Sequence, residues 1–116
     1  MGTNTITHIG QPGALASSVL EDWGAVGEPL GTPVPTLRGK ESRESPDVGV
    51  WECVPGKFRR QVKGAEFMHF VAGRARFHSD TGQVIEIRAG DAVYFPANTL
   101  GTWEVIETLR KTYAIW

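Results

Sequence analysis

The sequence predicts an all-β, single-domain barrel preceded by an irregular N-terminal arm, and three observations support this prediction. From Leu37 onward, apolar and polar residues alternate with a period of two, as in half-buried strands. The alternating segments recur about every 8 to 12 residues with turn residues between them, which is typical of sandwiches and barrels. The 116 residues include 14 glycines and 7 prolines, a high share that fits many turns between short elements.

Residues 1–36 show no such alternation. Ala14 to Trp23 could form a turn or two of helix, and the glycines and prolines of residues 27–35 make regular structure unexpected before about Thr36. This segment still carries large apolar side chains, which disordered segments usually lack. We therefore expect an arm over residues 1–36 that packs on the barrel or on a neighbouring subunit, the alternative being partial disorder, and a barrel domain over residues 37–116.

The expected strands are separated by turn residues. Residues 48–54 are rich in β-branched and aromatic side chains and end at Pro55-Gly56, a turn dipeptide. Further turns are expected at residues 80–82 and 89–91. The remaining expected strands are residues 58–62, 66–72, 75–78, 84–87, 92–95, 102–106 and 109–115.

Composition excludes several classes of protein. The chain has 12 Lys and Arg against 13 Asp and Glu, a net charge of −1, so it offers no broad attraction for nucleic acid or an anionic membrane. No apolar run approaches the ~18 residues that span a bilayer, and no secretory signal is recognisable. Cys53 is the single cysteine, so an internal disulfide is excluded. We expect a cytoplasmic protein without a nucleic-acid or membrane partner.

Two segments resemble the two motifs of the cupin superfamily. Glu66 and Gly73 are separated by six residues, as in the second half of the first motif, and Gly90 and Pro96 by five, as in the first half of the second motif. Together with the strings WECVPG at residues 51–56 and GTWE at residues 101–104, they are similar to the small cupin-3 group, often described as ureidoglycine aminohydrolase-like or ethanolamine-utilisation-like. The resemblance covers about residues 37–115 and implies a cupin jelly-roll barrel, the double-stranded β-helix.

The sequence departs from the cupin pattern at the metal ligands. Most cupins bind a metal through two histidines, a glutamate and a last histidine. In this sequence, the positions of the first two histidines fall at or next to Arg59 and Gln61, and the position of the last histidine falls at Gly101. Of the four ligand residues, the glutamate alone is present, as Glu66. Arginine cannot ligate a cation, and softer imidazole or thiolate ligands are preferred for transition metals. We therefore expect neither a metal nor another cofactor at this position, and His69, three residues after Glu66, should face the opposite side of its strand.

The interior of the barrel is the expected site. Strand parity is taken to place Arg59, Gln61, Glu66 and Met68 on the inner face, with Tyr94 joining them and Trp51 or Trp103 forming an apolar wall. Glu66 and Arg59 then allow two interpretations. Arg59 is either the structural partner of a buried carboxylate, or it binds a substrate anion while Glu66 acts as acid or base.

Function is left with alternatives at this point. The first is a small cupin that binds a small polar or anionic metabolite, with acid/base chemistry by Glu66 on an amide- or amine-bearing compound if it is an enzyme. The second is a non-catalytic binding or sensor module, and the third is a structural subunit whose barrel is filled by its own side chains. Apolar residues on both faces of residues 66–72 favour a homodimer that covers the outer face.

Overall fold

The computed structural model describes residues 4–116, so residues 1–3 of the expected arm lie outside the described residues. The arm contains two short 3₁₀ turns, η1 (Pro12–Ala14) and η2 (Ser17–Val19). The strands are β1 (Glu21–Ala25), β2 (Thr36–Arg43), β3 (Asp47–Cys53), β4 (Gly56–Val62), β5 (Glu66–Ser79), β6 (Val84–Arg88), β7 (Ala92–Phe95) and β8 (Thr99–Ile115). The described chain is therefore all-β, as the alternation predicts.

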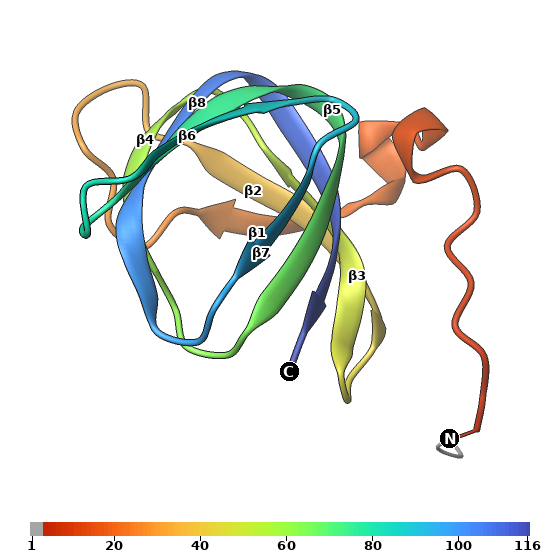
Figure 1. Cartoon of the computed structure of the whole chain (residues 1–116). Helices are drawn as coiled ribbons and strands as arrows, with labels where there is room; N and C mark the ends of the chain where they lie inside the picture. Colours follow the sequence, from red (N-terminus) through yellow and green to blue (C-terminus); the bar gives the residue numbers. More distant parts are fainter. Residues whose placement is uncertain (1–3) are drawn as a thin grey trace.

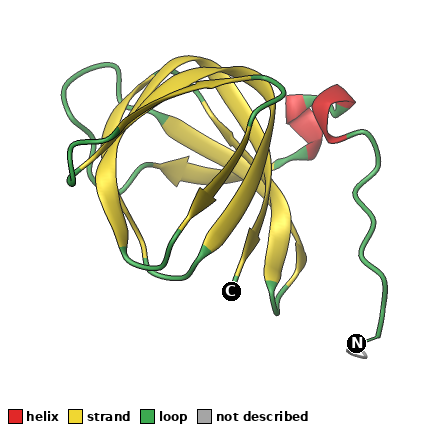
Figure 2. Ribbon diagram, viewed as in Figure 1, coloured by secondary structure: helices red, strands yellow, loops and turns green. Residues whose placement is uncertain are grey.

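The strands form one antiparallel sheet that curves into a barrel (Figures 1 and 2). The order is β1-β2-β3-β8-β5-β6, with β4 added to β8 and β7 added to β5. Two long strands, β5 and β8, pair along most of their length and bend together. The first half of β5 also pairs with β7, and its second half pairs with β6. The strand β5 therefore belongs to both walls of the jelly roll.

The bends explain why two pairs of expected strands are each one continuous strand in the structure. Residues 66–72 and 75–78 were expected as separate strands, yet both belong to β5 because Gly73 bends the strand without ending it. Gly73 has a φ of +91°, and a Cβ there would overlap the backbone of Thr108 in β8. The pairing of β5 with β8 shifts register on either side of this position. Residues 102–106 and 109–115 are likewise one strand, β8.

Part of the expected arm forms a strand. β1 pairs antiparallel with β2, with a register irregularity between Asp22 and Gly24. The segment before it lies against the outside of the barrel, where Arg110 of β8 donates hydrogen bonds to the carbonyl oxygens of Pro12 and Leu15. The buried ion pair between Arg110 and Glu52 lies beneath this segment, with an Nη2–Oε1 distance of 2.7 Å. The arm is thus held by polar contacts to a barrel strand.

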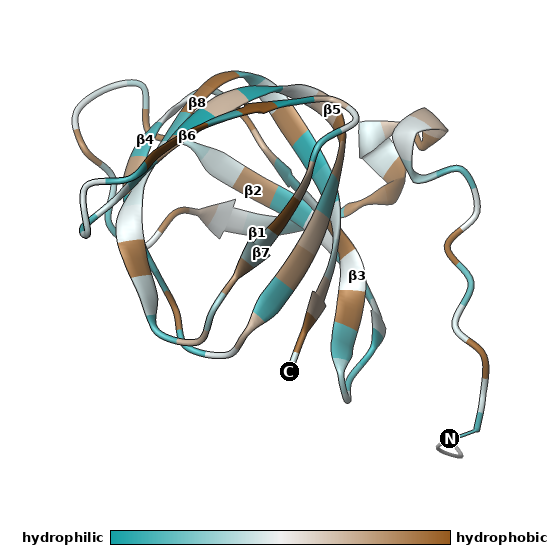
Figure 3. Cartoon of the chain, in the orientation of Figure 1, coloured by the Kyte–Doolittle hydropathy of each residue, from teal (hydrophilic) through white to brown (hydrophobic). Residues whose placement is uncertain are grey.

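An aromatic cluster fills one end of the barrel. Trp103 meets Phe77 edge to face, with ring centroids 5.1 Å apart, and Phe70 and Phe95 complete the cluster. All four side chains are almost fully buried, and aromatic pairs in this geometry add to the stabilisation from buried area. Figure 3 shows the corresponding alternation of hydrophobic and hydrophilic bands along the strands. Within residues 4–116, no helix is long and apolar enough to cross a membrane.

Candidate functional site

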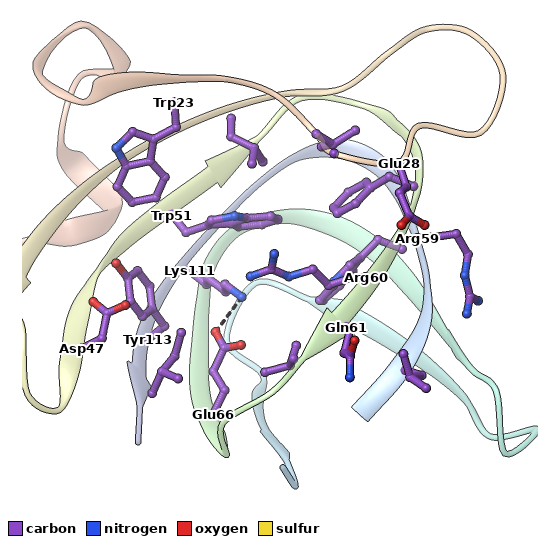
Figure 4. A pocket seen from close by; sticks show the side chains of 18 of the residues that line it. Trp23, Glu28, Asp47, Trp51, Arg59, Arg60, Gln61, Glu66, Lys111 and Tyr113 are labelled. Carbon is purple, nitrogen blue, oxygen red and sulfur yellow. Dashed lines mark hydrogen bonds and ion pairs between the residues drawn. The ribbon is translucent and has the colours of Figure 1, made fainter. Parts of the chain in front are cut away.

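The other end of the barrel contains a pocket of about 540 Å³ (Figure 4). Such a volume lies within the ~300–1,000 Å³ usual for small-molecule sites. Trp103 lines it and also belongs to the aromatic cluster, so this ring separates the filled end of the barrel from the open one. Its other walls include Trp23 of β1, Trp51 of β3, Phe58 and Val62 of β4, and Tyr113 of β8. A barrel filled entirely by its own side chains is therefore not what the structure shows.

Glu66 and Lys111 form an ion pair in the wall of this pocket. Glu66 begins β5 and Lys111 lies on the adjacent β8, and the Lys111 Nζ is 2.8 Å from the Glu66 Oε2. Their side chains are 3% and 7% exposed. An unpaired charge at this depth would cost several kcal/mol (about 3–5), so each of the two groups depends on the other.

Aromatic and sulfur groups complete the surroundings of Lys111. Its Nζ lies 4.5 Å from the centre of the Trp51 ring and 5.8 Å from that of Trp103. The Sδ of Met68 accepts a hydrogen bond from the same nitrogen at 3.3 Å. Burial lowers the pKa of Lys111 below its ordinary value, and the negative charge of Glu66 opposes this shift. The site thus holds an amine in an environment that favours its neutral form more than water does.

A carboxyl and a phenol, Asp47 of β3 and Tyr113 of β8, lie beside this ion pair. Burial raises the pKa of Asp47, while a hydrogen bond from the Tyr113 hydroxyl acts in the other direction. The Asp47 Oδ1 is buried without a hydrogen-bond partner in the described structure. Burial, together with the charges of Asp47, Glu41 and Glu66, also raises the pKa of Tyr113. Tyr113 is therefore a neutral hydrogen-bonding group near neutral pH.

Arg59 does not form the expected ion pair with Glu66. Its Nη2 lies 2.6 Å from the Asp80 Oδ2, and its Nη1 donates to the Thr102 hydroxyl at 3.0 Å. Phe58 and Val62 are the buried residues of β4 and define its inner face, so Arg59 and Gln61 alternate onto the outer one and border only the rim of the pocket. This corrects the expected orientation of both residues. The expected parity followed the family's histidine spacing and not the two apolar residues of the strand.

Arg60 occupies the inner position that Arg59 was expected to hold. It lies between Phe58 and Val62 in β4, at the exposed mouth of the pocket, and Figure 4 shows its guanidinium directed toward Lys111. Its positive charge contributes to the lowered pKa of Lys111, which also indicates proximity. Among the described residues, no hydrogen bond or ion pair engages its side chain. The spacing of Phe58 and Val62 in the sequence was the signal that could have identified this residue.

The remaining expected site residues divide into those inside the barrel and one outside. Met68, Trp51 and Trp103 lie around Lys111 as described above. Tyr94 does not join them: it is 58% exposed and stands opposite Phe67 on the outer face. The reason is that Phe95, the next residue of β7, is the buried one. Lys111, Tyr113, Asp47 and Trp23 were not predicted as site residues, because the sequence around them indicated only strands, an arm or the residues between them.

The side chains around Glu66 do not fit the metal site of most cupins. His69 is exposed on the opposite face of β5, as its parity predicts, His78 bonds Glu104, and His8 lies in the arm. Among residues 4–116, no group of three His, Cys, Asp or Glu side chains is placed to share an ion. The cation beside Glu66 is instead the chain's own Lys111.

An antiparallel jelly roll with one filled end and one hollow end is the architecture of the cupin fold. The chain belongs to the EutQ-like cupin domain family, whose family model matches residues 41–113. This agrees with the resemblance found in the sequence. No functionally curated protein matches the chain.

Solved structures share this fold. A DUF861-family protein of unknown function from Pseudomonas syringae is 23% identical with a TM-score of 0.75, covering 84% of this chain. This chain spans only 44% of that one. The EutQ protein of Clostridium difficile is 19% identical with a TM-score of 0.64, covering 77% of this chain and 75% of its own. A DUF861 protein of Thermotoga maritima is 27% identical over 58% of this chain and 76% of its own, with a TM-score of 0.56.

Proposed function

We propose that the barrel pocket binds a small metabolite that carries a carboxylate. The observation that supports this most directly is the unmatched guanidinium of Arg60 in a hollow with aromatic walls. Lys111 is neutralised by Glu66, and Arg59 by Asp80, which leaves Arg60 as a cation without an ion-pair partner in the described chain. A planar guanidinium can donate two parallel hydrogen bonds to the two oxygens of a carboxylate. Trp51 and Trp103 would then form the apolar wall for the rest of the ligand.

Binding can be measured by isothermal titration calorimetry and ligand-observed NMR with a panel of small carboxylates and their amides. We expect carboxylates to bind and Arg60→Met to weaken them by about 10- to 100-fold, as expected for a hydrogen bond to a charged group. Arg59→Met is the matched control, because Arg59 is neighbouring but engaged with Asp80. An equal effect of both substitutions would count against the proposal, and mass spectrometry of metabolites that copurify would identify the natural ligand.

The catalytic form of this proposal uses Glu66 as acid or base on an amide- or amine-bearing compound, as in the ureidoglycine aminohydrolase-like interpretation. The alternative is a non-catalytic binding or sensor module. Glu66→Gln distinguishes them once a ligand is known. Loss of turnover with retained binding supports the catalytic form, whereas binding without any turnover by the wild-type protein supports the module.

A second copy of the chain is the partner that we propose for the outer face. Phe67 and Tyr94 stand opposite each other there, 47% and 58% exposed, beside a shallow hollow lined by Val48 and Ala114. Burying such a patch in a dimer removes apolar surface from water. Phe67→Arg should shift the mass measured by light scattering to that of a monomer, and Val84→Arg, at an exposed residue of β6, should not.

We place this protein in the cytoplasm, where the free thiol of Cys53 stays reduced.

A further inference from the structure

We propose that Lys111 forms an imine with a small 2-oxo acid bound in the barrel pocket. The inference deepens the proposed function and rests on it, because the carboxylate of the 2-oxo acid is the group that Arg60 would bind. It adds two points, namely that the ligand carries a ketone or aldehyde next to the carboxylate and that the protein attaches to it covalently.

The position of Lys111 is the first argument. An imine-forming lysine needs an amine that opens on a cavity, surroundings that favour the neutral amine, and a neighbouring group that moves protons. Lys111 lines the pocket and is 7% exposed, with the Glu66 carboxylate 2.8 Å from its Nζ. The chain's other lysines, Lys40, Lys57 and Lys63, are exposed.

The neutral amine is accessible within the ion pair itself. Burial lowers the pKa of Lys111, and its proton can pass directly to the Glu66 oxygen that already accepts its hydrogen bond. Two charged groups that face Lys111, Arg60 and Glu66, also change its pKa. Arg60 lowers its pKa further, whereas Glu66 opposes the shift. The competing nucleophile, Cys53, is buried with its pKa raised to about 12, so its thiol stays protonated.

The reaction balances without any additional reactant. Lys111 gives one proton to Glu66, and the free electron pair of Nζ attacks the carbonyl carbon. One of the two remaining protons on Nζ then moves to the carbonyl oxygen, which gives a neutral carbinolamine. Glu66 then returns its proton to the hydroxyl group, the C–O bond breaks, and water leaves. The ammonium ion and the carbonyl compound have become an iminium ion and water, so the total charge is unchanged and Glu66 remains the counterion.

The choice of a 2-oxo acid follows from the placement of Arg60. Its guanidinium points toward Lys111, so a carboxylate bound there would hold the adjacent carbonyl close to the amine (Figure 4). The Trp51 ring, 4.5 Å from Nζ, offers a flat face for the planar imine. A ketone without a carboxylate would lack the contact with Arg60, and a hydroxy acid would lack the carbonyl.

The experiment incubates the full chain with pyruvate and cyanoborohydride, which reduces an imine to a stable secondary amine. Peptide mapping by mass spectrometry then locates the added carboxyethyl group. We expect at least ~10-fold more modification at Lys111 than at Lys40, Lys57 or Lys63, because burial and a proton acceptor activate only Lys111. Arg60→Met should reduce the modification of Lys111 by a similar factor, and Lys57→Arg should leave it unchanged.

The controls separate this inference from the proposed function. Lactate, which has the carboxylate but no carbonyl, should bind wild-type protein without forming an adduct. Lys111→Arg keeps a cation beside Glu66, and it should still bind lactate while losing the specific adduct. If lactate and pyruvate bind but modification is spread evenly over the exposed lysines, the imine is overturned and the proposed function stands. If neither binds, the imine is overturned, and the proposed function is overturned only when no carboxylate of the panel binds either.

Discussion

The Lys111 Nζ lies 2.8 Å from the Glu66 Oε2 inside the barrel, beside the glutamate that the resemblance to cupins relates to a metal ligand. The positive charge beside Glu66 is the side chain of Lys111 on β8. Since both side chains are almost fully buried, the pair links the first residue of β5 to the adjacent strand. It therefore affects both the stability of the fold and the chemistry of the pocket.

Removing one partner of this pair should destabilise the fold strongly. We expect Lys111→Met to lower the free energy of unfolding by about 3–5 kcal/mol, because Glu66 is left as an unpaired buried charge. The double variant Glu66→Gln/Lys111→Met should recover much of that loss, since no charge remains buried. Urea denaturation followed by circular dichroism would measure both. A double variant as unstable as the single one would show that packing by Lys111, and not charge pairing, is the main effect.

The Arg110–Glu52 pair should attach the arm to the barrel. Arg110 is bonded to Glu52 and to carbonyl oxygens of Pro12 and Leu15, and its side chain is 6% exposed. Arg110→Met should therefore cost about 3–5 kcal/mol and expose residues near 12–15 to proteolysis. The exposed Arg59–Asp80 pair gives the matched control, because solvent screens this pair and Arg59→Met should change stability little. Limited proteolysis and urea denaturation check the two effects, and an arm as protected as in the wild type would contradict the first.

The sequence predicted the fold better than the site because each depends on different information. Period-two alternation and turn residues are local, so they identified the all-β class and most strand positions. The glycine at position 73 signalled a turn but could not show that β5 continues through it, since this depends on the close approach of β8. Glu66 and Trp51 were predicted inside the barrel, and both line the pocket.

The errors in the site arose from face assignment and from pairing over long sequence distances. A shift of one residue reverses the face of a strand, and this is the difference between Arg59 and Arg60 in β4. Phe58 and Val62 contained the information for the correct choice. Lys111 is different, because it lies 45 residues from Glu66 and nothing local distinguishes it from a solvated lysine. Only the antiparallel register of β5 with β8 brings the two together.

The position of the Trp23 ring should depend on the absence of a side chain at Gly39. Trp23 lines the pocket from β1, and a Cβ at Gly39 of β2 would overlap its ring. Gly39→Ala should therefore displace the indole and cost about 1–3 kcal/mol from overpacking, with a red shift of tryptophan fluorescence. Gly27→Ala is the control, because a Cβ there meets nothing within 4 Å. Unchanged fluorescence in Gly39→Ala would show that the ring accommodates the methyl group in place.

The charged form of Asp47 should lower the free energy of unfolding at neutral pH. Burial raises its pKa above the ordinary 3.8, so the folded state binds more protons than the unfolded state between 3.8 and the folded value. The cost of its charged form is thus absent below 3.8, grows as the pH rises through that window, and is fully present above the folded pKa. Asp47→Asn removes this cost, so it should be more stable than the wild type at neutral pH, and the difference should disappear on acidification.

Urea denaturation of the two proteins from acidic to neutral pH tests this dependence, because titration of all other groups is common to both and cancels in the difference. Asp47 takes part in no ion pair with the described residues, and an amide oxygen can still accept the hydrogen bond from Tyr113, so Asp47→Asn changes mainly the charge. Glu44→Gln, at an exposed residue of the preceding turn, is the control and should leave the profile unchanged. A difference that persists below 3.8 would show that Asp47 acts through packing, whereas one that grows only above it would identify the buried charge as the cause.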